Sequence, residues 1–161
     1  MTDTLALEKW VWTENDFEQM GWHDTHIYSL AFFPDTFEFA IDLDYIFRWF
    51  RPQEEETHFR FWVAPATMVF ENVNDIQFDI LTSAGLEVAD ITRESPQTPK
   101  NAEFVTKSTE WTWNIECQEG LISLKAVGYR MYVRATPTLL QRQIIGIEKR
   151  GGISFLRCVV S

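Results

Sequence analysis

The stretch "FEFAIDLDYIFRWF" (37–50) decides the fold class of this chain. Every second residue in it is aromatic or aliphatic, and the positions between include Glu38, Asp42, Asp44 and Arg48. The apolar positions repeat seven times with a period of two. A helix has a period of 3.6, so this alternation predicts a long β-strand with one apolar face.

Further strands are predicted on both sides of this stretch. "THIYSLAFF" (25–33) is expected to form a hairpin with it, with "PDT" (34–36) at the tip. Pro65 is expected to separate two strands, and Gly128 to mark a bulge or a close backbone approach. Alternating or mostly apolar runs between turn residues predict the other strands, with one strand or two in the last segment: 58–65, 67–73, 76–81, 86–94, 109–118, 121–134 and 144–160.

These eight to ten strands predict a mainly β chain with a single all-β domain over residues 1–161. The architecture expected is a single-domain antiparallel β-sandwich or an open curved barrel with a short N-terminal helical turn. That turn is expected within 13–22, with Thr13 or Asn15 as its N-cap. The seven tryptophans and thirteen phenylalanines agree with pleated, well-packed surfaces.

The charge balance restricts the partners of the chain. Its formal net charge is −10. This excludes nucleic acid and anionic membrane surfaces, because both require clustered lysine and arginine, and it favours a basic partner. No apolar run approaches the roughly 20 residues of a spanning helix. Neither a signal peptide nor a CxxC spacing is present, so we expect a cytoplasmic protein in which Cys117 and Cys158 are reduced.

The segment "GWHDTHI" (21–27) holds the residues that most resemble a reactive site. His23, Asp24 and His26 could ligate a metal together with the carboxylates of the next strand, since zinc takes three or four such ligands. In the alternative interpretation, Asp24 caps a turn and the His23 ring binds a backbone carbonyl. No metal or cofactor is expected in that interpretation.

Asp42 and Asp44 lie on the same side of the predicted strand, about 7 Å apart. Such a pair can bind a hard cation or act as acid and base in a glycosidase. The alternative is a solvated polar face neutralised by Arg48 or by a neighbouring strand. The candidate functional cluster is therefore His23, Asp24, His26, Asp42 and Asp44. If it acts, the chain is a metal- or carboxylate-dependent hydrolase; otherwise it has no catalytic residue.

The tryptophans suggest a second alternative, a carbohydrate-binding module with exposed aromatic rings. Trp111 and Trp113 share a face with Ile115 and Cys117, so that face is expected to point into the core. The tryptophans expected to be partly exposed are Trp10, Trp12, Trp22, Trp49 and Trp62.

Three segments of the chain resemble a known group of proteins: "GWHDTHIYSLAF", "FAIDLDYI" and "ATMVFENVNDIQFDI". They are similar to immunity proteins of bacterial polymorphic toxin systems, in particular to immunity protein 50-like sequences. The resemblance covers about half of the chain. The positions that carry it are Trp22, His23, Asp24, Phe70, Glu71, Val73 and Asp75. It implies a protein that neutralises a toxin by binding it.

The preferred prediction is therefore a non-catalytic, protein-binding module whose partner is a basic toxin domain. Negative charge would accelerate its association with such a partner. A dimer is compatible with the many aromatic residues, although the sequence does not fix the oligomeric state. The carboxylates expected at the contact surface are Glu38, Glu54, Glu55 and Glu56, together with Asp42 and Asp44.

Overall fold

The computed structural model describes residues 5–55 and 58–159. These residues form short 3-10 helices and mostly long strands. The helices are η1 (Glu14–Gln19), η2 (Pro34–Thr36) and η3 (Ala102–Phe104). The strands are β1 (Val11–Thr13), β2 (His26–Phe33), β3 (Glu38–Phe50), β4 (Arg60–Glu71), β5 (Asn74–Ile80), β6 (Leu86–Gln97), β7 (Glu110–Cys117), β8 (Gly120–Ala126), β9 (Gly128–Val133) and β10 (Thr138–Leu140).

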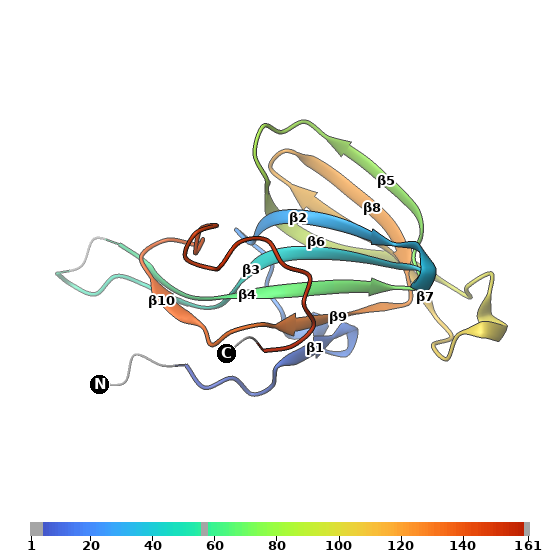
Figure 1. Cartoon of the computed structure of the whole chain (residues 1–161), viewed down its shortest axis with the longest axis horizontal. Helices are drawn as coiled ribbons and strands as arrows, with labels where there is room; N and C mark the ends of the chain where they lie inside the picture. Colours follow the sequence, from blue (N-terminus) through green and yellow to red (C-terminus); the bar gives the residue numbers. More distant parts are fainter. Residues whose placement is uncertain (1–4, 56–57, 160–161) are drawn as a thin grey trace.

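The ten strands form one antiparallel sheet in the order β1-β9-β4-β3-β2-β6-β7-β8-β5, and β10 pairs with β4. The sheet curves so that β5 and β8 lie above β2 in Figure 1, but it does not close into a barrel. The mainly β, antiparallel fold class is confirmed, with all strands in one open, curved sheet. No helix among the described residues is long and apolar enough to cross a membrane.

Several local predictions are confirmed. β2 and β3 form the expected hairpin, with η2 at its tip. The N-terminal turn is η1, whose N-cap Thr13 forms a capping box with Asp16. Close approach occurs at Gly128, where a Cβ atom would lie 2.4 Å from the Glu14 carboxylate.

Other predictions are wrong. Pro65 does not interrupt β4, because it lies between the residues that pair with β10 and those that pair with β9. Its missing N–H therefore costs no ladder hydrogen bond there. The run 121–134 forms two strands, β8 and β9, because a bend at Val127 separates them. The segment 144–159 contains no strand, whereas the predicted loop 135–143 contains β10.

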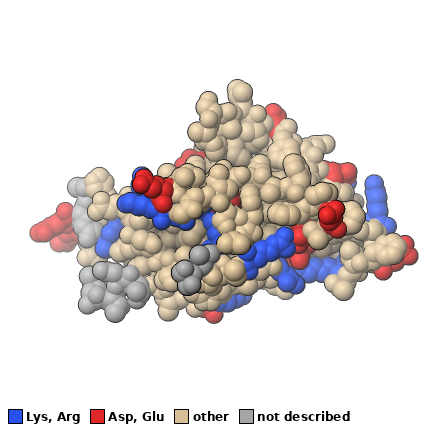
Figure 2. All heavy atoms as spheres, viewed as in Figure 1, with Lys and Arg blue, Asp and Glu red and all other residues tan. Residues whose placement is uncertain are grey.

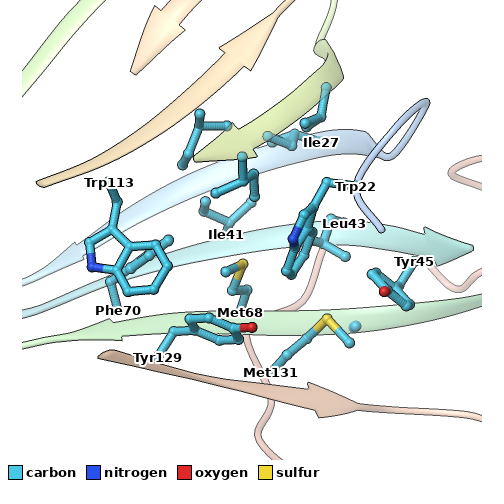
Figure 3. Packing of buried hydrophobic residues seen from close by; sticks show 14 of the residues in the cluster. Trp22, Ile27, Ile41, Leu43, Tyr45, Met68, Phe70, Trp113, Tyr129 and Met131 are labelled. Atoms are coloured by element: carbon cyan, nitrogen blue, oxygen red, sulfur yellow. The ribbon is translucent and has the colours of Figure 1, made fainter. Parts of the chain in front are cut away.

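The main core lies on the concave side of the sheet. Alternate residues of β3, among them Ile41 and Leu43, face it together with Met68 of β4 (Figure 3). Trp22 reaches into this core from the chain ahead of β2, with its ring edge-on to Tyr45 at 5.3 Å between centroids. The first strand of the hairpin is thus fixed by a buried aromatic side chain that precedes it.

The opposite face of the central strands is also covered. Residues 39–46 of β3 are all buried, although their sequence alternates. A second apolar cluster on this face joins Ile46, Phe61 and Val63 to Ile145. The C-terminal segment that carries Ile145 crosses in front of β2, β3 and β4 (Figure 1). This segment, 141–159, has no regular secondary structure and takes the place of a second layer.

Candidate functional site

Asp42 lies beneath the C-terminal segment and is fully buried. Its Oδ1 accepts hydrogen bonds from Arg150 at 2.6 Å and from Arg134 at 2.9 Å. Its Oδ2 accepts from Arg150 at 2.8 Å and from the Ser154 backbone N–H at 2.9 Å. Arg150 therefore binds this carboxylate in a bidentate manner, the strongest geometry for such a pair.

Asp44 is equally buried and shares Arg150 with Asp42. Its Oδ1 accepts from Arg150 Nε at 3.1 Å, and its Oδ2 accepts from the Ile145 N–H at 2.7 Å and the Tyr28 hydroxyl at 2.5 Å. The Tyr28 hydroxyl in turn accepts from the Gly146 N–H at 3.0 Å. Burial, followed by the hydrogen bond to Asp44, raises the pKa of Tyr28.

These contacts assign the two carboxylates a structural role. Burial lowers the pKa of Arg150, but its contacts with both carboxylates outweigh burial, so the net shift is upward. The pKa of Arg134 is lowered, because burial dominates there. The prediction that Asp42 and Asp44 lie on a contact surface is wrong: neither is exposed, and their cations are Arg134 and Arg150, not Arg48.

The segment "GWHDTHI" forms a turn ahead of β2. Asp24 has φ of 67°, and its N–H donates to the Val88 carbonyl at 2.8 Å. Nδ1 of the exposed His23 ring lies 3.3 Å from the Ala89 carbonyl oxygen, and the ring stacks on Trp49 at 6.2 Å. These contacts agree with the alternative interpretation of the segment, in which it forms a turn and the His23 ring binds a backbone carbonyl.

His26 lies elsewhere in the fold, although it is close in sequence. It is paired in the sheet with Asp44 and Glu87, and its ring lies edge-on to Tyr28 at 4.6 Å. Burial lowers the pKa of His26, and the neighbouring carboxylates only partly oppose this. Within residues 5–55 and 58–159, no group of three or more His, Cys, Asp or Glu side chains is arranged to hold a metal ion.

The predicted contact carboxylates have different environments. Glu38 is half-buried and accepts from both terminal nitrogens of Arg157, at 2.9 and 3.1 Å. Burial raises the pKa of Glu38, but the hydrogen bonds from Arg157 and Thr36 outweigh burial, so its pKa is lowered. Glu54 and Glu55 are exposed in the loop after β3, and Glu56 lies outside the described residues.

The tryptophan predictions are partly wrong. Trp22 and Trp62 are buried, because Trp22 fills the core and Trp62 lies on β4 between β3 and β10. Trp10 and Trp49 are exposed, at 36% and 41%. Trp113 points into the core as predicted.

An acidic row crosses the outer face of the other half of the sheet. Asp90 of β6 lies opposite Glu116 of β7, and Glu116 lies opposite Leu121 of β8. Leu121 lies opposite Asp79 of β5. Residues directly opposite in antiparallel strands point to the same face, and all four are exposed. Sequence reasoning missed this row because it depends on the register of four strands.

The carboxylates of this row have no cation beside them. In the part of the chain that the structure describes, none of Asp79, Asp90 and Glu116 forms an ion pair. The nearby Lys125 pairs with Asp75 instead. Directly opposed like charges destabilise a sheet, so the pair of Asp90 and Glu116 is a local cost to stability.

Comparisons with known proteins add no further constraint. No model of a protein family matches the chain, and no curated protein or solved structure matches it. The similarity to immunity proteins therefore stays a prediction, and the function has to be argued from this chain's own geometry.

Proposed function

We propose that this protein is a non-catalytic binding module of the cytoplasm and that its partner is a protein with a basic surface. The row of Asp79, Asp90 and Glu116 carries this proposal. Asp90 and Glu116 oppose each other across β6 and β7 without a cation, which costs stability in the free protein. A basic partner would supply the missing cations and would be steered towards the row.

The distribution of cations supports the same surface. Three arginines hold the C-terminal segment to the sheet, namely Arg134, Arg150 and Arg157. Lys107 pairs with Glu14 and Glu71. Because these cations are paired with other carboxylates, they do not neutralise Asp79, Asp90 and Glu116 on the outer face of β5 to β8. The resemblance to immunity proteins makes a basic toxin domain the favoured partner.

Two further observations support a binding role in the cytoplasm. Every oxygen of Asp42 and Asp44 is engaged by the protein itself, so this pair has no free oxygen for a substrate. Both Cys117 and Cys158 are free thiols, and burial raises the pKa of Cys117 to about 12. Such a thiol is a poor nucleophile, and free thiols fit a reducing compartment.

The test is binding of the purified protein to the product of the gene next to its own. We expect saturable binding whose association rate falls steeply with salt. Asp90→Lys combined with Glu116→Lys should slow association by at least about tenfold. The matched control is Glu8→Lys with Glu103→Lys, which adds the same charge at exposed positions outside the row. Equal association rates for the two double variants would exclude the row as the contact surface.

A further inference from the structure

An apolar groove separates β2 from β5. It has a volume of about 230 Å³ and is lined by Ile27 and Leu30 of β2, Phe78 and Ile80 of β5, and Gly85 and Leu86 at the start of β6. Exposed apolar side chains flank it: Phe32 is 61% exposed, Phe78 44% and Leu81 91%. A groove of this size can take one large apolar side chain.

The strands on both sides of the groove have open edges. After Ile27, β2 pairs with β3 alone among the described strands. Likewise, β5 pairs with β8 alone. The backbone N–H and C=O groups of these strands that face the groove therefore have no strand partner. An open, apolar edge is a template for another extended segment.

Three carboxylates flank the residues that line the groove, although none of them lines it. Asp79 lies on β5 and Glu87 on β6, and both are exposed. The Glu119 side chain accepts from the Glu87 N–H at 2.9 Å, and its carbonyl accepts from the Leu81 N–H at 3.1 Å. No ion pair involves these three carboxylates within the described residues. Otherwise, the upper part of the molecule, over β5 and β8, shows mainly uncharged residues in Figure 2.

We propose that this groove binds an extended segment of the protein partner. The segment adds to the open edge of β5, places one large apolar side chain in the groove and carries lysine or arginine opposite Asp79, Glu87 and Glu119. This inference rests on the proposed function, because it names the element that the basic partner presents. Asp79 of the row lies in β5 between Phe78 and Ile80, which line the groove, so the two surfaces are adjacent.

Charge complementarity selects this occupant over a second copy of the chain. With a net charge of −10, two copies repel each other, and each would bring further carboxylates close to Asp79, Glu87 and Glu119. A lysine-bearing strand, in contrast, has its apolar side chains on one face and its cations on the other. Phe78 and Asp79 present these same two faces at the edge of β5.

The experiment uses the full chain and a synthetic probe. The probe is an end-blocked heptapeptide in which lysine alternates with valine and the central residue is phenylalanine. Fluorescence anisotropy measures its affinity, and hydrogen exchange of the wild-type protein locates its contact. We expect saturable binding, with slower exchange of the amides in β5.

Three control peptides separate the contributions. Glutamate in place of lysine should abolish binding, alanine in place of phenylalanine should weaken it about tenfold, and N-methylation of alternate amides should abolish it by blocking strand addition. On the protein side, Asp79→Asn with Glu87→Gln and Glu119→Gln should weaken binding about tenfold. The matched control, Asp35→Asn with Glu8→Gln and Glu103→Gln, should leave it unchanged.

The outcomes discriminate clearly. Equal binding of the N-methylated peptide, or protection confined to strands other than β2 and β5, overturns the proposal. A dimer in sedimentation velocity that Phe78→Ser dissociates also overturns it, because the groove then holds a second copy. If the adjacent gene's product binds but the peptide does not, the groove is excluded and the proposed function stands. If only the peptide binds, the groove is supported and the proposed partner is wrong.

Discussion

Two groups of carboxylates lie on the same sheet and have opposite environments. Asp42 and Asp44 of β3 are fully buried and bind Arg150. Asp90 and Glu116 of β6 and β7 are exposed and oppose each other without a cation. In the sequence, Asp42, Asp44 and Glu116 each lie between apolar residues of an alternating run. What differs is whether another segment covers the face, and this depends on the fold as a whole.

The C-terminal segment makes the difference. It crosses β2, β3 and β4 and brings Arg150 and the backbone N–H groups of Ile145 and Ser154 to the carboxylates. No described segment bonds to the acidic row in this way. Buried charges are tolerated only when paired and hydrogen-bonded, whereas exposed charges need no partner. The first group therefore stabilises the fold, and the second remains available for binding.

The largest loss of stability is expected when Arg150, the cation that Asp42 and Asp44 share, is replaced. Arg150→Met leaves Asp42 and Asp44 buried with only part of their hydrogen bonds, so we expect a loss of about 3–5 kcal/mol in the free energy of unfolding. Urea denaturation measures it. Lys149→Met, at the exposed neighbouring position, is the control and should change stability by less than about 0.5 kcal/mol. Similar stabilities for the two variants would mean that the network does not hold the segment.

Tyr28→Phe tests the same network through a neutral group. The change removes the donor to Asp44 and the acceptor for the Gly146 N–H, both of which lie in the covered region. We expect a loss of about 1–3 kcal/mol, because buried polar groups lose their partners. Thermal and urea denaturation should agree on this value. No loss would show that the hydroxyl contacts contribute nothing to stability.

Glu38, which pairs with Arg157, is half-buried, so its burial lies between that of the two groups of carboxylates. The folded pKa of Glu38 is lowered from its ordinary value of 4.5, so its contribution to stability is complete above that value and is lost as the pH falls through the folded pKa. Glu38→Gln should reduce stability at pH 7 by at most about 1 kcal/mol. It should also flatten the fall in stability below pH 4.5.

Glu55→Gln is the control for this experiment, since Glu55 is exposed in the loop after β3. Its stability should follow that of the wild type across the same range of pH. A profile of Glu38→Gln that runs parallel to the wild type would contradict the role given to the pair with Arg157.

Local structure was largely predictable from the sequence. The period of two in β3 and the turn residues in "PDT" specify the β2–β3 hairpin, and Thr13 with Asp16 specifies the cap of η1. These features depend on neighbouring residues alone. Pro65 was misinterpreted because its tolerance depends on which strands flank β4, and no local pattern carries that information.

The site was much less predictable, because its contacts join distant residues. Arg150 is 108 residues from Asp42, and its segment resembles a strand in composition. Two carboxylates on a strand predict a nearby cation in general terms, but not which of the arginines supplies it. The acidic row was missed for the same reason, since Asp90 meets Glu116 only through the register of β6 and β7.

The smallest effect on stability is expected at the acidic row. The sign of that effect shows whether the row serves binding or the fold. Glu116→Lys replaces an opposed like-charge pair with an opposite-charge pair to Asp90, so it should stabilise the free protein by about 0.2–1 kcal/mol. The same change should slow association with a basic partner, whereas Glu103→Lys, at another exposed position, should leave both properties nearly unchanged. A residue whose replacement improves the fold and impairs binding is retained for binding. If Glu116→Lys instead destabilises the protein, the row serves the fold, as Asp42 and Asp44 do.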